Sequence, residues 1–142
     1  MAKIFIDGKE LEAEEGATIF NAAKEAGIEI PHFCYHPAFI PEGTCRMCLV
    51  EIEGLPKLEL SCSTVVKDGM KVSTKSEKVV DARKGVLEFL LADHPLDCPV
   101  CDQAGNCKLQ DYYQEYGFFE SQFSEVKEKN DKKRIIGKYL IH

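Results

Sequence analysis

The sequence has no long hydrophobic run and few of the residues that mark fibrous or unfolded chains. Glycine and proline number 10 and 6 among 142 residues, while 44% of the residues are hydrophobic, which excludes a collagen-like repeat and a disordered tail. The most apolar stretch, Val86–Ala92, is interrupted by Glu88 and is far shorter than the about 18 residues of a membrane span. The charged alternation after Met1 does not resemble a secretory signal. We therefore expect a soluble, cytoplasmic protein with no membrane-inserted segment.

Motifs for nucleotide binding and nucleophilic catalysis are also missing. The sequence contains no Gly-x-Gly-x-x-Gly, no Gly-x4-Gly-Lys and no evident nucleophile with its base, so we expect no independent substrate site. The net charge is −6, and residues 1–62 hold 5 Lys/Arg against 11 Asp/Glu. An acidic face repels phosphate backbones, so nucleic acid is not expected as a partner. The basic stretch Lys127–Arg134 contains Glu128 and Asp131 and is interpreted as a solvated tail or docking segment.

What the sequence does have is seven cysteines. They form two groups, Cys34-x10-Cys45-x2-Cys48-x13-Cys62 and Cys98-x2-Cys101-x5-Cys107. An odd number of cysteines without a signal peptide disfavours a secreted disulfide scaffold. Clustered thiols in a reducing cytosol usually bind metal or carry out redox chemistry.

Of the four histidines, one is a candidate ligand that would complete the second cysteine group. Three thiolates leave one position of a four-ligand site open, and His94, four residues before Cys98, is the nearest candidate to fill it. His32 and His36 flank Cys34, but that group already has four thiols, so they are interpreted as supporting or surface groups. His142 is interpreted as incidental. Seven cysteines and one histidine thus make two complete four-ligand sets.

Three chemistries can use such sets. Thioredoxin-like redox pairs would need each Cys-x2-Cys to follow a strand and open a helix in a parallel α/β domain, and the flanking residues do not show this. Structural zinc suits both ligand sets, although its sites usually pair two close knuckles. An iron–sulfur cluster spreads its ligands over several irons and accepts more scattered sources. Zinc remains the main alternative on spacing alone.

Turn residues and hydrophobic patterning predict an α+β fold for the first half. Asp7-Gly8 is a two-residue hairpin turn between strands 4–6 and 9–13. Thr18 is a candidate N-cap for a helix that Gly27 ends. Further strands are predicted at 47–53, 57–61 and 70–73. A ubiquitin-like β-grasp sheet fits this order best, with ligand loops at 32–48 and at the Ser61-Cys62 strand end.

The second half is predicted to be helical. Ser76 can cap a helix whose apolar stripe is Val79, Val80, Val86, Leu87, Leu90 and Leu91. This helix should end near Asp93-His94-Pro95, because the residue before proline is disfavoured in α geometry. A ligand loop and a helix over 106–116, closed by Gly117, follow. The predicted domains are 1–75, 76–124 and a polar extension, 125–142, that leaves the fold.

The ligand regions resemble a known family. Residues Ile28–Pro37, Cys45–Ile52 and Ser61-Cys62 resemble the amino-terminal [2Fe–2S] domain of the large iron–sulfur subunit of respiratory complex I (NADH:quinone oxidoreductase), and of related [FeFe]-hydrogenases and NAD(P)-linked formate dehydrogenases. The run His94–Asp111 is similar to the [4Fe–4S] segment that follows in this family. Its His-Pro-Leu-Asp-Cys-Pro and Cys-Asp-Gln sequences resemble the complex I branch more than the hydrogenases.

The resemblance covers about residues 1–125 and implies two cofactors. It implies Cys34, Cys45, Cys48 and Cys62 on one [2Fe–2S] cluster, and His94, Cys98, Cys101 and Cys107 on one [4Fe–4S] cluster. The implied function is one-electron relay from a flavin-bearing NADH dehydrogenase subunit to further iron–sulfur subunits, in a complex peripheral to the inner membrane. Two alternatives are the same module in a hydrogenase or formate dehydrogenase, and a zinc-stabilised interaction domain.

Overall fold

A mixed β-sheet forms the N-terminal half of the protein. The computed structural model describes residues 1–117, 120–128, 135–136 and 140–141. In this described part, five strands make one sheet in the order β2-β1-β5-β3-β4, with bounds β1 Ala2–Ile6, β2 Lys9–Ala13, β3 Leu49–Ile52, β4 Glu59–Leu60 and β5 Met70–Ser73. β1 runs parallel to β5, and the other pairs are antiparallel. The α+β class predicted from the sequence is confirmed.

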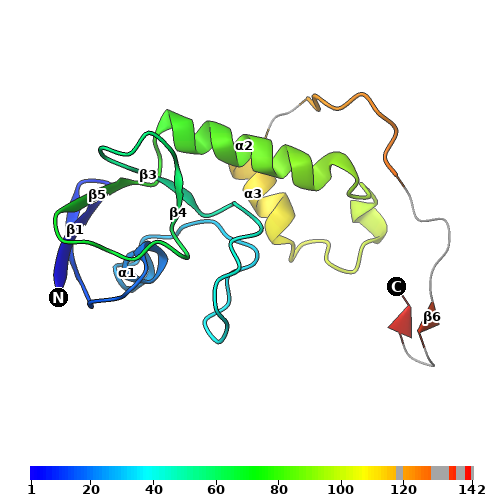
Figure 1. Ribbon diagram of the computed structural model, residues 1–142. Coiled ribbons are helices and arrows are strands. Elements are labelled where there is room, and N and C mark those ends of the chain that lie inside the picture. The colour runs from blue at the N-terminus through cyan, green and yellow to red at the C-terminus, as the bar shows by residue number, and fades with distance from the viewer. Residues whose placement is uncertain (118–119, 129–134, 137–139, 142) are drawn as a thin grey trace.

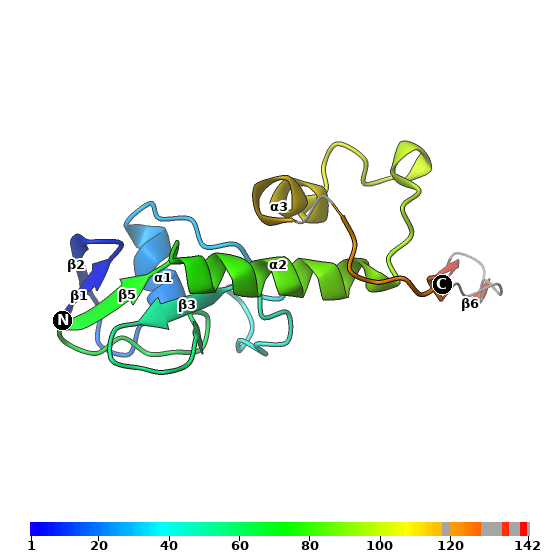
Figure 2. The ribbon, with the colours of Figure 1, turned by 90° about the horizontal axis from the view of Figure 1, so that it is seen from above.

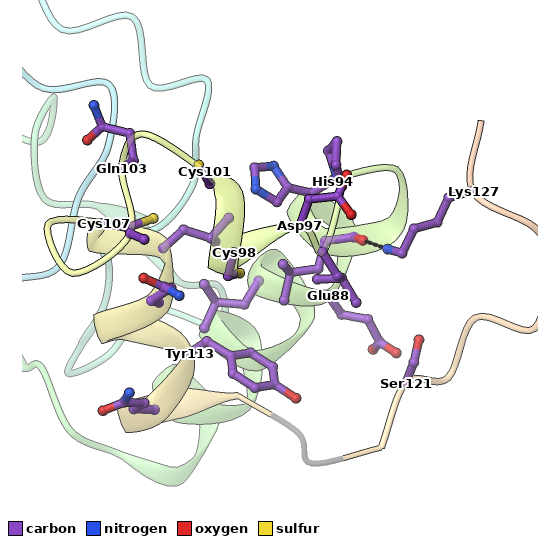
Figure 3. A pocket seen from close by; sticks show the side chains of 18 of the residues that line it. Glu88, His94, Asp97, Cys98, Cys101, Gln103, Cys107, Tyr113, Ser121 and Lys127 are labelled. Atoms are coloured by element: carbon purple, nitrogen blue, oxygen red, sulfur yellow. Dashed lines mark hydrogen bonds between the residues drawn. The ribbon is translucent and has the colours of Figure 1, made fainter. Parts of the chain in front are cut away.

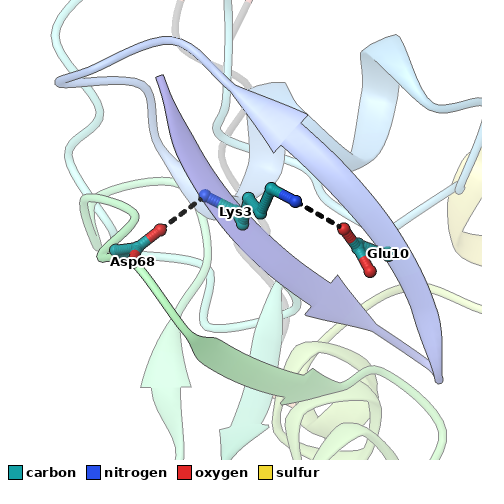
Figure 4. A network of polar contacts seen from close by, with 3 residues as sticks. All are labelled: Lys3, Glu10 and Asp68. Carbon is teal, nitrogen blue, oxygen red and sulfur yellow. Dashed lines mark hydrogen bonds and ion pairs between the residues drawn. The ribbon is translucent and has the colours of Figure 1, made fainter.

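The predicted hairpin between β1 and β2 is present. Asp7 and Gly8 have φ values of 50° and 81°, the left-handed pair that a tight hairpin turn with the twist of the strands requires. The Asp7 carboxylate also accepts hydrogen bonds from the backbone N–H (2.7 Å) and hydroxyl (2.5 Å) of Thr74, which follows β5. In Figure 4, Lys3 of β1 reaches Glu10 of β2 through its ammonium (3.3 Å) and Asp68 through its backbone N–H (2.9 Å). These contacts tie β1 to β2 and to the residues on either side of β5.

The first helix, α1 (Ile19–Glu25), packs on this sheet (Figure 1). The Thr18 hydroxyl accepts from the backbone N–H of Asn21 (3.3 Å), which is the predicted N-cap. Gly27 has φ 73° and lets the chain turn away from the helix. An irregular segment then runs from the end of α1 to β3 and carries three of the seven cysteines.

Two longer helices make the second part. α2 (Glu77–Ala92) begins at the predicted N-cap Ser76, whose hydroxyl accepts from the N–H of Val79 (3.4 Å). α3 (Lys108–Tyr116) lies beside α2, and the loop joining them curls round the end of α2 farthest from the sheet (Figures 1 and 2). This loop contains one 3-10 turn, Cys98–Val100. α2 ends before His94-Pro95, as predicted.

Two hydrophobic clusters hold these elements together. The larger one lies between the sheet and α1 and contains Ile4, Ile6, Ile19, Phe20, Val50 and Val72, among others. The smaller one joins α2 and α3 to the segment before β3, through buried Met47, Leu87 and Tyr112. The cysteine-bearing segment is therefore packed between both halves of the protein.

Several predicted boundaries differ from the structure. β3 and β4 are shorter than the strands predicted at 47–53 and 57–61, because Met47 and Cys48 belong to the ligand segment and Ser61 and Cys62 to the turn after β4. The helix predicted over 106–116 begins at Lys108. Two strands that were not predicted, β6 (Ile135–Ile136) and β7 (Leu140–Ile141), pair antiparallel.

Candidate metal centres

The first four-cysteine group converges from three segments. The sulfur atoms of Cys34 and Cys45 lie 3.3 Å apart, in a thiol–thiol hydrogen bond. Cys48 and Cys62 are held next to each other because the backbone N–H (3.1 Å) and hydroxyl (2.8 Å) of Ser61 both donate to the Cys48 carbonyl oxygen. The predicted ligand loops, 32–48 and the end of the strand at Ser61-Cys62, thus meet at one place.

The surroundings of these thiols shift the pKa values of Cys34 and Cys62 in opposite directions. Burial raises the pKa of the Cys62 thiol to about 12, helped by its hydrogen bond with Cys48 and by the charges of the other three thiols. Burial also acts to raise the pKa of Cys34, but hydrogen bonds from Cys45 and Thr44 outweigh it and the pKa lies below its ordinary value. One end of the site is dry and the other faces the surface, since Cys48 and Cys62 are buried and Cys34 and Cys45 are half-buried.

The backbone turns sharply beside these thiols. Gly43 has φ 68°, a conformation that favours glycine, and a Cβ there would lie 2.8 Å from Leu60 Cδ1, so that the leucine side chain would have to move. Arg46, between Cys45 and Cys48, also has a positive φ (58°), which is unusual for a residue with a side chain. The turn brings the backbone N–H groups of Thr44 and Cys45 to the Cys34 sulfur. Such donors stabilise sulfur ligands that carry negative charge.

The second predicted set lines one cavity. His94, Cys98, Cys101 and Cys107 all border a cavity of about 630 Å³ at the end of α2 (Figure 3). Cys98 and Cys101 flank the 3-10 turn, where the N–H of Cys101 donates to the Cys98 carbonyl (3.2 Å). Cys107 caps α3, and its carbonyl accepts from Asp111 N–H (3.1 Å). Gly105, with φ 80°, turns the chain between these two points.

The wall of this cavity is mostly apolar. Leu87 and Leu91 of α2 and Leu109 and Tyr113 of α3 contribute to it. Apolar walls with a few converging ligands are typical of cofactor sites. Of the tyrosines of α3, Tyr113 borders the cavity, whereas Tyr112 is buried in the smaller core.

The chain after α3 returns to α2, which corrects two predictions. The Lys127 ammonium donates to the carbonyls of Leu91 and Ala92 (3.1 Å to the latter), where a cation is favoured because the last carbonyls of a helix are unpaired (Figure 3). Glu128 N–H donates to the Asp93 carboxylate (3.1 Å). The expectation that the chain leaves the fold from Glu125 is therefore wrong at Lys127 and Glu128, and of the two interpretations of the basic stretch Lys127 does not fit the solvated tail. The rest of the basic stretch, 129–134, and His142 lie outside the described residues.

Two further side chains support the sites. His32 packs edge-on against Phe20 (4.8 Å between ring centres), and its Nδ1 lies 3.0 Å from the Ile30 carbonyl oxygen, in keeping with a supporting role. Its backbone N–H also donates to the Tyr112 hydroxyl (3.3 Å), which links the ligand segment to α3. Arg83 is buried beside the first site. The sequence pattern, in which it lies within an apolar stripe, predicts no role for it.

The donor sets fit clusters of iron and sulfide. All seven cysteines are free thiols, as ligation requires. Among the described residues, no group of three or more His, Cys, Asp or Glu side chains is arranged to hold a single metal ion. A cavity of about 630 Å³ behind His94 and three cysteines has space for a larger inorganic core. The first site has four thiols in two contacting pairs, Cys34 with Cys45 and Cys48 with Cys62, and the second has three thiols and one imidazole around one cavity.

Comparison with known proteins shows that this chain is an iron–sulfur protein. Residues 1–77 match the family described as "2Fe-2S iron-sulfur cluster binding domain", and residues 83–122 match the "NADH-ubiquinone oxidoreductase-G iron-sulfur binding region". The chain belongs to the 2Fe-2S iron-sulfur cluster binding domain family. Its cofactors are one [2Fe–2S] cluster and one [4Fe–4S] cluster.

Individual relatives agree with this assignment. The NADH-ubiquinone oxidoreductase 75 kDa subunit of Reclinomonas americana is 50% identical over 135 residues, which are 95% of this chain and 20% of that protein. A subunit of the NADH-quinone oxidoreductase of Rickettsia felis is 49% identical over 140 residues, 99% of this chain and 20% of its own length. The present chain thus spans about a fifth of these curated relatives.

A solved structure of a redox enzyme is also similar to this chain. The NAD+-reducing [NiFe]-hydrogenase in its H2-reduced state superposes with a TM-score of 0.81 at 32% sequence identity, covering 91% of this chain and 54% of the other. Within the described residues of the present protein, no helix has the length and apolar character needed to span a membrane.

Proposed function

We propose that this chain is the electron-relay module of a complex I-like NADH:quinone oxidoreductase. Residues 1–75 form a β-grasp, ferredoxin-type domain for the [2Fe–2S] cluster, and residues 76–124 form a helical domain for the [4Fe–4S] cluster. The convergence of the two sequence-predicted ligand sets at two separate sites is the observation that carries this proposal. Relatives named as subunits of NADH-quinone and NADH-ubiquinone oxidoreductases, about half identical to this chain, support the choice of complex.

The proposed ligands divide by site. Cys34, Cys45, Cys48 and Cys62 hold the [2Fe–2S] cluster as thiolates. The second set, His94, Cys98, Cys101 and Cys107, holds the [4Fe–4S] cluster. When bound, the clusters supply one-electron chemistry, and the protein's part is to hold them, orient the ligands and limit access of water.

The residues around each site are suited to this role. Buried Cys48 and Cys62 keep one side of the first site away from water, while half-buried Cys34 and Cys45 bring the other side close to the surface, where a partner can exchange electrons. At the second site, leucines of α2 and α3 form an apolar wall, while Cys101 and His94 line the cavity from exposed positions. We propose a flavin-bearing NADH dehydrogenase subunit and further iron–sulfur subunits as the partners, in a complex peripheral to the inner membrane.

Elemental analysis of anaerobically purified protein tests the cofactors. Two clusters require about six iron and six sulfide per chain with little zinc, and a brown colour. Zinc without sulfide in a colourless protein would instead favour the zinc-stabilised interaction domain.

A second candidate is the same relay in a hydrogenase or a formate dehydrogenase. It is supported by the NAD+-reducing [NiFe]-hydrogenase, whose structure resembles this chain over 91% of its length. Affinity purification of the chain from its source distinguishes the two. Co-purifying quinone reductase subunits support the first candidate, and a hydrogenase or formate dehydrogenase large subunit supports the second.

Exchange of His94 for cysteine tests the ligand set of the second site. A neutral imidazole leaves the bound cluster with one negative charge fewer than a thiolate would, and histidine ligation accompanies a raised potential in Rieske centres. We expect His94→Cys to lower the [4Fe–4S] midpoint potential by on the order of 100 mV. Redox titration followed by EPR measures this shift, with the [2Fe–2S] midpoint in the same sample as the control. An unchanged [4Fe–4S] midpoint would show that His94 is not a ligand.

A further inference from the structure

A buried cation lies beside the first site. Arg83 projects from the middle of α2 and is 1% exposed. Its Nη2 donates to the carbonyl oxygen of Leu49 (3.1 Å), the residue that directly follows Cys48. Its Nη1 donates to the Tyr116 hydroxyl (3.3 Å). The guanidinium thus bridges α3 and the backbone next to a cysteine of the [2Fe–2S] site.

The described part of the protein gives this cation no carboxylate partner. No ion pair with Arg83 lies within 4.0 Å among the described residues, and its Nε has no hydrogen-bond partner there. Both of its contacts are with neutral oxygens, and the Tyr116 ring lies 5.2 Å from the guanidinium carbon. A buried charge without a counter-charge is costly, whereas the same charge beside an opposite one is retained.

The negative charges that face Arg83 come from two directions. Burial lowers its pKa, while Tyr116, Glu115 and Cys48 raise it. Glu115 is exposed on α3 and reaches Arg83 through the Tyr116 hydroxyl, so water screens its charge. Cys48 is buried, as Arg83 is, and directly precedes the residue whose carbonyl Arg83 contacts, so water screens its charge weakly. Arginine stays protonated even in such surroundings.

We propose that Arg83 sets the reduction potential of the [2Fe–2S] site by acting as the buried counter-charge to its thiolates. This inference rests on the proposed function of that site. Reduction adds one electron, and hence one negative charge, to the site without breaking a bond. A fixed positive charge in a poorly screened interior favours the reduced state and raises the midpoint potential. Arg83 is not itself a ligand, and it contacts the first residue of β3, next to the ligand segment.

Neutral and charged replacements test this role in the full chain with both clusters loaded. We expect Arg83→Met to lower the reduced-to-oxidised ratio of the [2Fe–2S] cluster about tenfold at a fixed solution potential, which is 59 mV for a one-electron couple. Arg83→Lys keeps the charge and is expected to recover most of the shift. Lys78→Met removes the same charge from an exposed position of α2 and serves as the matched control. Redox titration monitored by EPR is the measurement.

A merely structural role predicts a different set of results. If Arg83 only ties α2 to Leu49 and Tyr116, Arg83→Met and Arg83→Lys would destabilise the protein to a similar extent. Neither would then shift the [2Fe–2S] midpoint potential more than Lys78→Met does. That result overturns the proposal. If Arg83→Met fails to assemble the [2Fe–2S] cluster but keeps the [4Fe–4S] signal, while Arg83→Lys keeps both, the need for the charge is supported. Loss of both signals in both variants overturns it. An absent [2Fe–2S] signal in the unmodified chain would instead contradict the proposed function.

Discussion

Cys62→Ser is expected to abolish the EPR signal of the reduced [2Fe–2S] cluster while leaving the [4Fe–4S] signal near its full intensity. Cys62 has no exposed surface, and its thiol is in electrostatic contact with the other three thiols of its group. A serine hydroxyl is a much poorer iron ligand than a thiolate. No other cysteine can take its place, since the remaining three of the chain border the separate cavity at the end of α2. Iron content should fall by about two atoms per chain.

The reciprocal substitution provides the control. Cys101→Ser changes an exposed thiol of the second group, and we expect it to remove the [4Fe–4S] signal and to spare the [2Fe–2S] signal. Both variants are reduced under identical conditions and measured by EPR, and their iron and sulfide contents are determined. The measurements compare the two cluster signals in each of the two variants. Loss of both signals in either variant would contradict two independent sites.

Local features of this fold could be predicted from the sequence because their causes are local. Asp7-Gly8 forms the hairpin turn through its own backbone conformation, and Thr18 and Ser76 cap their helices through atoms three residues away. The proposed ligand sets rest on a related kind of reasoning, and their members lie near one another in the structure. Close spacings bring some cysteines together, and the number of donors needed to complete each set restricts the others.

Features that depend on distant partners could not be predicted in the same way. Arg83 interrupts an apolar stripe, and its burial becomes favourable only because Leu49 and Tyr116, 34 and 33 residues away, supply hydrogen-bond acceptors. Lys127 lies in a segment whose polar composition is typical of solvated chain. Its ammonium nevertheless binds the unpaired carbonyl groups at the end of α2. Leu90 fits the helical stripe but is 41% exposed, whereas Leu87 of the same stripe is fully buried.

The smaller hydrophobic core explains how the two sites are kept in fixed relation. Leu87 of α2 is fully buried in it, together with Met47 of the first ligand segment and Tyr112 of α3. Cys45 packs against this cluster, and Leu87 also borders the cavity of the second site. The Leu87 side chain therefore contacts the surroundings of both centres, and we expect its truncation to affect both.

We expect Leu87→Ala to lower the free energy of unfolding of the helical part by roughly 2–5 kcal/mol, because it removes a buried side chain and leaves a cavity. Native-state hydrogen exchange on the anaerobically purified chain measures this. Amides of α2 and α3 should exchange at least about tenfold faster, while those of β1 and β5, which belong to the larger core, keep their protection.

Leu90→Ala is the matched control for this experiment. It deletes the same atoms from the same helix at a position that is 41% exposed, and we expect a loss below about 1 kcal/mol. Equal effects of the two variants would contradict the position of Leu87 in the core. Faster exchange in β1 and β5 as well would mean that both cores unfold as one unit, so that α2 and α3 stabilise the first site as well as forming the second.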